Sequence, residues 1–300
     1  MQLSLKQLYS SMRHNGNNLR IEDLPITSLP AGLCIPGDLE LVGTEITELP
    51  NDLFVEGSIT IKNTPITSLP SHLLVRLDLC LEKTNITELP DNMMVMGNLR
   101  IRDTPLKSLP SGLNVTGDLY LYRTDIVELP SDLSVRGNVL IWYTPLKSLP
   151  SGVIFRGDLS LNNTQVTELP SDLRVAKRLS IEDSPITSLP FGLTLDSLSL
   201  VSTEITELPN DLNITQGLAI SHTPIKSLPT GIKSLKCLWL DDTKMTELPS
   251  GLDVDMLVIH NMGITKLPSD IRVHTSLRIW NTPIKGKCSI TTRLAFDFVL

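Results

Sequence analysis

The chain has 300 residues, is 41% hydrophobic but only 4% aromatic, and carries a formal net charge of −7. This acidic balance argues against nucleic acid or an anionic membrane as the partner, because phosphate binding requires a concentrated basic surface. No stretch of about 18 apolar residues is present, so no membrane span is expected.

The four cysteines are far apart and follow no metal-binding or disulfide spacing. They stand at Cys34, Cys80, Cys237 and Cys288. The first six residues lack a basic segment followed by an apolar core, so no secretory signal is expected. We therefore expect reduced thiols in a cytoplasmic protein, located in a bacterial cytosol or in the cytosol of a host cell.

The first predicted element is a helix within residues 1–17. Its apolar residues recur with helical spacing at Leu5, Leu8, Tyr9 and Met12. Ser4 with Gln7 resembles a capping box at its start, and Gly16 is suited to end it. We expect this segment to be an N-terminal cap, since the open end of a repeat array would expose core and a strand edge.

Residues 18–287 repeat one pattern. A Leu-Pro dipeptide recurs every 20 residues, or 19 in two places, beginning at Leu29, Leu49, Leu69, Leu89, Leu109, Leu129, Leu149, Leu169, Leu189, Leu208, Leu228, Leu248 and Leu267. Before each dipeptide, alternate residues such as Leu119 and Leu121 face inward along an extended segment. Proline fixes φ and lacks an N–H donor, which favours an extended return path over a helix. The repeat predicts a solenoid of about fourteen coils, with one strand per coil in a parallel sheet.

The repeat unit Leu-x-Leu-x-x-(Asn)-x-Leu-x-x-Leu-Pro-x-x-Leu resembles the leucine-rich-repeat signature. Its 20-residue period is similar to the short bacterial subtype, found in effectors of the YopM and IpaH/SspH kind and in related bacterial and phage proteins. The resemblance implies a parallel β-sheet on the concave face, extended or turn segments on the convex face, and little helix beyond the cap. IpaH/SspH effectors add a ubiquitin-ligase domain with a Cys-x-Asp motif. No cysteine here has that context, so this activity is not expected.

The position that usually holds Asn in this family holds Thr or Ser here. The residues are Thr44, Thr64, Thr84, Thr104, Thr124, Thr144, Thr164, Ser184, Thr203, Thr223, Thr243 and Thr282. We expect a stacked ladder whose hydroxyls donate to neighbouring backbone carbonyls. Leu24 and Met262 break the ladder. Leu24 belongs to the first coil, where a capping layer could cover it, and the sequence offers no reason for Met262.

A second period of about 40 residues is superimposed on the first. The residue before Leu-Pro alternates between Ser, as at Ser188 and Ser227, and Glu, as at Glu207 and Glu247. Stacked strands lie about 4.8 Å apart, so alternation separates like charges by roughly 10 Å. We interpret this as solvated structural patterning, with an acidic docking stripe as the alternative.

The outward-facing strand positions hold the best candidates for function, because they have no core role. Three of the four tyrosines and all three tryptophans fall there. One predicted cluster spans three consecutive coils and comprises Arg100, Arg102, Tyr120, Tyr122, Arg123, Leu140, Trp142 and Tyr143. A second, looser cluster comprises Trp239, His260, Arg278 and Trp280, with His222 and Val258 beside them. Tyr, Trp and Arg are enriched at the energetic centres of protein interfaces.

These clusters predict a protein-binding scaffold that engages its partner through the concave face, as a secreted effector or as a phage-encoded inhibitor of a host protein. Two alternatives remain open: a self-assembling structural protein whose aromatics pack in a homo-oligomer, and a glycan-binding module. The five histidines have no metal-ligand spacing, and phosphate-loop and hydrolase motifs are absent. We therefore expect no enzyme, no metal and no cofactor.

The Leu-Pro mark fails after Ile284, and the remaining chain alternates apolar residues at Leu294, Phe296, Phe298 and Leu300. We expect residues 288–300 to form a C-terminal cap. A docking tail for a partner is the alternative.

Overall fold

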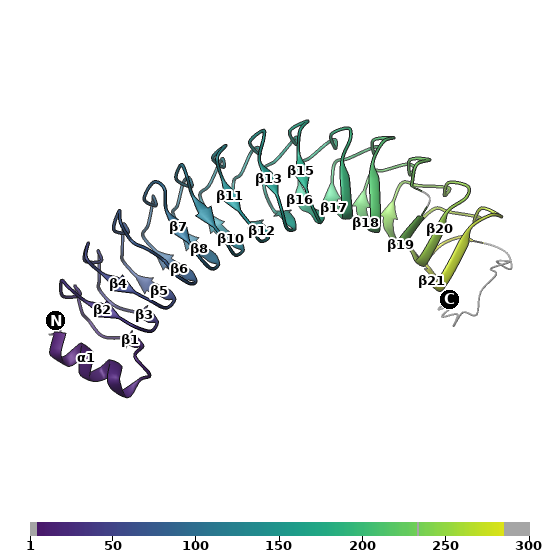
Figure 1. The fold of residues 1–300 in the computed structure, drawn as a ribbon. Helices are drawn as coiled ribbons and strands as arrows, with labels where there is room; N and C mark the ends of the chain where they lie inside the picture. The colour runs from purple at the N-terminus through teal and green to yellow at the C-terminus, as the bar shows by residue number, and fades with distance from the viewer. Residues whose placement is uncertain (1–4, 233, 285–300) are drawn as a thin grey trace. The chain divides into compact units, whose positions relative to one another are not determined.

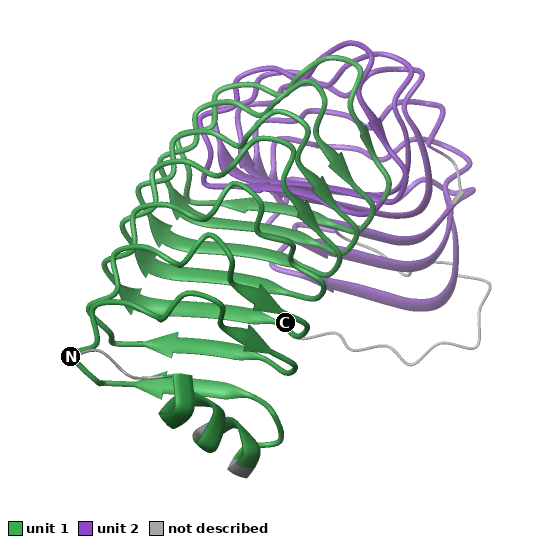
Figure 2. Ribbon diagram, turned by 60° about the vertical axis from the view of Figure 1, so that its left-hand side comes forward, with its two compact units in different colours: residues 1–156 green, residues 157–300 purple. Residues whose placement is uncertain are grey.

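The computed structural model describes residues 5–232 and 234–284, and it divides into two compact units, 1–156 and 157–300 (Figure 2). Ser4 of the expected capping box and the expected C-terminal cap therefore lie outside the described residues. In each unit, taken by itself, the longer strands line the inner side of the curve and the return segments run along its outer side (Figure 1). This is the predicted parallel solenoid.

Helix α1 (Leu5–His14) forms where the sequence predicts it. Leu8 and Met12 are buried, and the backbone carbonyl of Met12 accepts hydrogen bonds from the N–H groups of Asn15 and Asn17. Gly16 follows the helix with φ of 60°, the left-handed conformation that commonly ends helices. That the helix acts as a cap stays a prediction.

Unit 1 has seven main strands, one per coil, which form a sheet in which each strand is parallel to the next and offset by 20 residues. They are β1 (Leu19–Glu22), β3 (Leu39–Val42), β5 (Ile59–Thr64), β6 (Leu79–Thr84), β8 (Leu99–Thr104), β10 (Leu119–Thr124) and β12 (Val139–Trp142). Two-residue strands lie on the return path: β2 (Cys34–Ile35), β4 (Phe54–Val55), β7 (Met94–Val95), β9 (Asn114–Val115), β11 (Ser134–Val135) and β13 (Ile154–Phe155).

Unit 2 contributes the other seven main strands, most of them longer. They are β14 (Leu159–Asn162), β16 (Arg178–Ser184), β17 (Thr194–Thr203), β18 (Asn213–Thr223), β19 (Ser234–Thr243), β20 (Asp253–His260) and β21 (Arg272–Trp280), with the short β15 (Arg174–Val175) before β16. The two 19-residue intervals correspond to register shifts, between Leu195 and Ser197 and between Val254 and Met256. A coil one residue short therefore keeps its core positions aligned by an irregularity in the strand.

Every coil places Leu, Ile or Val at the predicted inward positions, and these side chains are almost completely buried. Along β10, for example, Leu119 and Leu121 are buried while Tyr120 and Tyr122 are only half-buried. Because strands have a side-chain period of two, this alternation leaves one face of the sheet for the core and one for contacts. In each unit, we call the outward-pointing side of the sheet of main strands the sheet face.

A ladder of Asp and Asn side chains connects neighbouring coils of unit 1 by hydrogen bonds at the start of the main strands. Asn98 Oδ1 accepts the N–H of Asp118 at 2.8 Å, and Asp118 Oδ1 accepts the N–H of Asn138 at 2.7 Å. In most coils a glycine precedes the ladder residue and leaves room for this stacking, whereas Asn17 precedes Asn18 and Leu77 precedes Asp78. A Cβ on Gly117 would lie 2.5 Å from Asn98 Oδ1 and 2.6 Å from the carbonyl oxygen of Gly97.

The predicted Thr and Ser ladder is buried from Thr44 to Thr243, whereas Thr282 is half-buried. Its predicted hydrogen bonding is largely wrong. Thr64 does donate to the Lys62 carbonyl at 3.0 Å, and Thr164 lies 3.0 Å from the Ser184 hydroxyl. Six hydroxyls have no hydrogen-bond partner in the described part of the chain: those of Thr84, Thr104, Thr124, Thr144, Thr203 and Thr223. A hydroxyl carries one donor on a shorter arm than an Asn amide, so the coil-to-coil hydrogen bonding falls to the Asp and Asn ladder instead.

The two exceptions to the Thr ladder differ from each other. Met262 is only 3% exposed, so this position is part of the core and accepts an apolar side chain. Leu24, by contrast, is 41% exposed, so the expected covering of this residue by a capping layer is wrong.

Candidate partner-binding surface

The structure brings all eight residues of the first predicted cluster together on the sheet face of unit 1. We call Arg100, Arg102, Tyr120, Tyr122, Arg123, Leu140, Trp142 and Tyr143 the arginine–aromatic cluster. Strand register sets one row with Tyr120 between Arg100 and Leu140, and a second row with Tyr122 between Arg102 and Trp142. Arg123, near the end of β10, and Tyr143, directly after β12, extend the cluster.

Stacked cations and rings hold the cluster in place. The guanidinium of Arg102 lies 4.9 Å from the ring centre of Tyr122, and that of Arg123 lies 5.0 Å from the same ring. Arg123 also lies 5.7 Å from the ring of Tyr143, and the rings of Tyr122 and Tyr143 meet edge to face at 5.3 Å. Each such contact contributes about 0.5–1 kcal/mol at an exposed site. The cluster is thus organised by contacts within the chain itself, and such preorganisation lowers the entropy cost of binding in general.

Acidic residues anchor the other row of the cluster. Arg100 Nη1 donates to Asp78 Oδ2 at 2.8 Å, and its guanidinium lies 5.1 Å from the ring of Tyr120. Tyr120 donates its hydroxyl to Asp118 Oδ2 at 2.8 Å, and this hydrogen bond raises the pKa of Tyr120. Burial opposes ionisation of Asp78, but hydrogen bonds from the N–H of Asn98 and from Arg100 bring its pKa below the usual value. These contacts orient the two side chains, so only part of each remains for a partner.

Two members of the cluster occupy a backbone conformation that their residue types disfavour. The residue that precedes each Thr-ladder position has positive φ, and in most coils it is Asn, Asp or Gly. Here the residues are Arg123 with φ of 50° and Tyr143 with φ of 57°. A bulky side chain in the left-handed region costs roughly 1–2 kcal/mol. The chain therefore places large side chains where its own repeat favours small ones, and Tyr143 is half exposed.

The second predicted cluster lies on the sheet face of unit 2 and is only partly assembled. His260 and Trp280 are in contact, with ring centres 5.0 Å apart, and His260 Nδ1 lies 2.8 Å from Asp241 Oδ1. In the neighbouring row Trp239, Val258 and Arg278 are register partners. His222 stands apart near the end of β18, with its Nε2 3.8 Å from Asp242 Oδ2.

The structure corrects the expectation that Val258 lies exposed beside the second cluster. Its position is outward-facing by register, but its side chain is completely buried. Its register partners Trp239 and Arg278 are much larger, and side chains opposite one another in adjacent strands lie within contact distance. Trp239 itself remains 40% exposed. Of the second predicted cluster, Trp239, His260, Arg278 and Trp280 are exposed or half-buried.

Sequence reasoning missed the anchoring role of Asp78 and Asp118, and it missed Phe191. The two aspartates belong to a position where Asp, Asn and Ser recur, but only the three-dimensional contacts show which of them also hold cluster residues. Phe191 had a detectable signal: it follows Leu-Pro where the other coils have Ala, Asn, Ser, Asp or Thr. Its side chain is exposed in the structure.

Within the described residues, no group of three or more His, Cys, Asp or Glu side chains could hold a metal ion. The same part of the chain contains no helix of the length and apolarity needed to cross a bilayer.

Strand register, coil length and core pattern together define a leucine-rich-repeat solenoid. Comparison with solved structures agrees. A leucine-rich-repeat protein of Leptospira interrogans matches with a TM-score of 0.60 at 20% identity, over 90% of this chain and 81% of that one. The leucine-rich effector YopM of Yersinia pestis matches with a TM-score of 0.54 at 18% identity, over 96% and 91% of the two chains. This chain thus has the fold of bacterial leucine-rich-repeat proteins. No protein-family model and no curated protein matches its sequence.

Proposed function

We propose that this protein is a non-enzymatic scaffold that binds a partner protein through the sheet face of unit 1, with the arginine–aromatic cluster at the centre of the contact. The observation that carries the proposal is the concentration of preorganised Arg, Tyr and Trp side chains on three adjacent strands. In a chain so poor in aromatics, this composition matches the energetic centres of protein interfaces.

The left-handed backbone at Arg123 and Tyr143 supports the same conclusion. Most other coils have Asn, Asp or Gly at this positive-φ position, so folding alone does not require large side chains here. Local strain that persists at a surface is a reason to look for function. The sheet face of unit 2, with Trp239, His260, Arg278 and Trp280, would provide a second contact.

Affinity capture tests the proposal. A variant with Tyr122→Ala and Trp142→Ala should capture the partner at least tenfold less well, a loss of about 1.4 kcal/mol or more. The matched control is Val42→Ala with Lys62→Ala, which changes the same row of the sheet face on β3 and β5, outside the cluster. Both variants should retain the wild-type circular dichroism spectrum. Equal capture by the cluster variant and the wild type would refute the assignment.

The source of the lysate tests whether the protein acts in a eukaryotic host cell or in a bacterial cell. Capture from a eukaryotic lysate would favour a secreted effector, and capture from bacterial lysate alone would favour a phage-encoded inhibitor. Light scattering tests the self-assembly alternative. A monomer whose capture depends on Tyr122 and Trp142 supports the scaffold, and a dimer lost in the same double variant supports self-association.

A further inference from the structure

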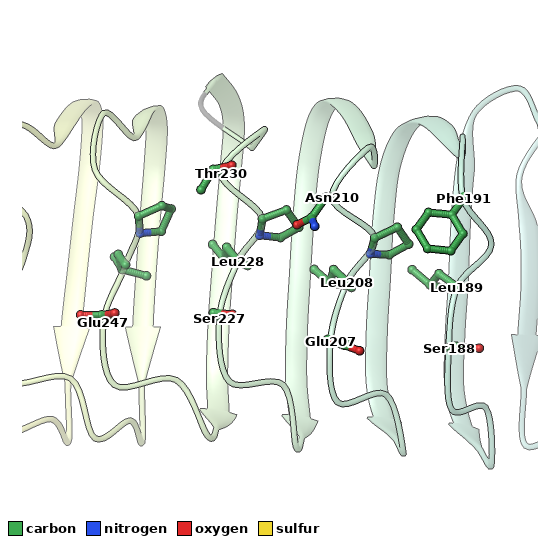
Figure 3. Close-up of a pocket in the computed structure, with 14 residues that line it drawn as sticks. Ser188, Leu189, Phe191, Glu207, Leu208, Asn210, Ser227, Leu228, Thr230 and Glu247 are labelled. Atoms are coloured by element: carbon green, nitrogen blue, oxygen red, sulfur yellow. The ribbon is translucent and has the colours of Figure 1, made fainter.

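A hollow of about 680 Å³ lies over the return segments of unit 2 (Figure 3). One edge is the row in which Ser and Glu alternate, and the other is formed by the residues that follow each Leu-Pro dipeptide. Figure 3 shows these two rows as Ser188, Glu207, Ser227 and Glu247, and as Phe191, Asn210 and Thr230. Buried leucines and their prolines lie between the rows, so the floor is apolar.

Phe191 makes this hollow different from the rest of the solenoid. At 78% it is the most exposed large hydrophobic side chain in the described part of the chain. The other coils show that a small polar residue is sufficient to continue the repeat at this position. An exposed aromatic ring beside an apolar floor is typical of a surface that another molecule covers.

The charge of the residues that line the hollow indicates which kind of molecule would bind there. Among the described residues that line it, the ionisable ones are Glu207 and Glu247, and both are exposed. They stand two coils apart, with Ser227 between them. Stacked strands lie about 4.8 Å apart, and the return segments run along the outer side of the curve (Figure 1), so the two carboxylates are separated by about 10 Å or more. Two carboxylates at this distance, over an apolar floor, complement two cations joined by an apolar linker.

We propose that this hollow binds an extended basic peptide segment of another protein, with two Arg or Lys side chains three residues apart. In the polyproline II conformation the chain rises about 3.1 Å per residue with three residues per turn, so residues i and i+3 face the same side about 9 Å apart. The long Arg or Lys side chains extend this separation, so that each can reach one of Glu207 and Glu247. The two cations donate charge-assisted hydrogen bonds to the carboxylates, and an apolar residue of the peptide covers the ring of Phe191.

The test uses a fluorescein-labelled peptide of sequence Pro-Arg-Pro-Leu-Arg-Pro-Leu and fluorescence anisotropy at low salt with the full chain. Glu207→Gln with Glu247→Gln should raise the Kd at least tenfold, and Phe191→Ser should do the same. The matched control is Glu88→Gln with Glu128→Gln, two glutamates two coils apart in unit 1 without a neighbouring aromatic. This control should bind like the wild type.

Several outcomes would overturn the proposal: no binding by the wild type, equal binding of a peptide with Glu in place of both Arg residues, or equal weakening by the unit 1 control. A wild type that dimerises and becomes monomeric with Phe191→Ser would assign the hollow to a second copy of the chain. The variant Tyr122→Ala with Trp142→Ala should keep its peptide affinity, so failure of the sheet-face proposal remains distinguishable from failure of this one.

Discussion

Replacement of Gly117 by alanine should destabilise the protein by about 2–4 kcal/mol, and the reason lies in the contact between neighbouring coils. The new Cβ would lie 2.5 Å from Asn98 Oδ1 and 2.6 Å from the carbonyl oxygen of Gly97, far inside normal contact distance. The backbone cannot move away from this overlap freely, because hydrogen bonds hold the two coils together. Gly117 donates its N–H to the Gly97 carbonyl at 2.9 Å, and Asp118 donates its N–H to Asn98 Oδ1 at 2.8 Å.

Relief of the overlap requires the two coils to separate, which weakens both hydrogen bonds at roughly 1 kcal/mol each. Overpacking strain adds about 1–3 kcal/mol. The lower chain entropy of the unfolded alanine variant offsets about 0.4–1 kcal/mol of this loss. The expected net effect is therefore several times that of an average exposed substitution.

Urea unfolding followed by circular dichroism measures this change, with the m-value as a check that the unfolding transition keeps its cooperativity. The matched control is Gly263→Ala, because a Cβ there meets nothing within 4 Å and the backbone is not left-handed. This control should be neutral or slightly stabilising. A loss below about 0.5 kcal/mol for Gly117→Ala, or an equal loss for both variants, would refute the reasoning.

Three further changes test other features. Thr124→Val should raise the unfolding free energy by up to about 1 kcal/mol, because it removes a buried hydroxyl without a partner, whereas Thr64→Val should lower it in the same urea assay. Tyr143→Asn should change stability by less than about 1 kcal/mol, because relief of backbone strain offsets lost ring contacts, while partner capture falls. Asp78 has a lowered folded-state pKa, so its stabilisation is present above the unfolded pKa of about 3.9 and is lost as the pH falls. Asp78→Asn should therefore show a shallower loss of stability below about pH 4, and an unchanged acid-unfolding curve would contradict this.

Much of the fold follows from the sequence because a repeat states the same structural rule many times. A Leu-Pro dipeptide every 20 residues, with alternating apolar residues before it, predicts both the inward side chains and the 20-residue offset between paired strands. The offset in turn places Arg102, Tyr122 and Trp142 in one row. The membership of the arginine–aromatic cluster could thus be predicted without coordinates, because it depends only on counting residues along the repeat.

What only the tertiary structure decided depends on distances between atoms of different coils. Repeat counting cannot show that Thr124 finds no hydrogen-bond partner while Asp118 bonds the next coil, because hydroxyl and carboxylate reach differ by little more than one bond length. It cannot show that Val258 is buried by larger neighbours, or that Phe191 stands beside a hollow. The sequence by itself determined which side chains share a face. Packing between coils determined which of those side chains remain available to a partner, because exposure is a property of neighbours that the repeat does not specify.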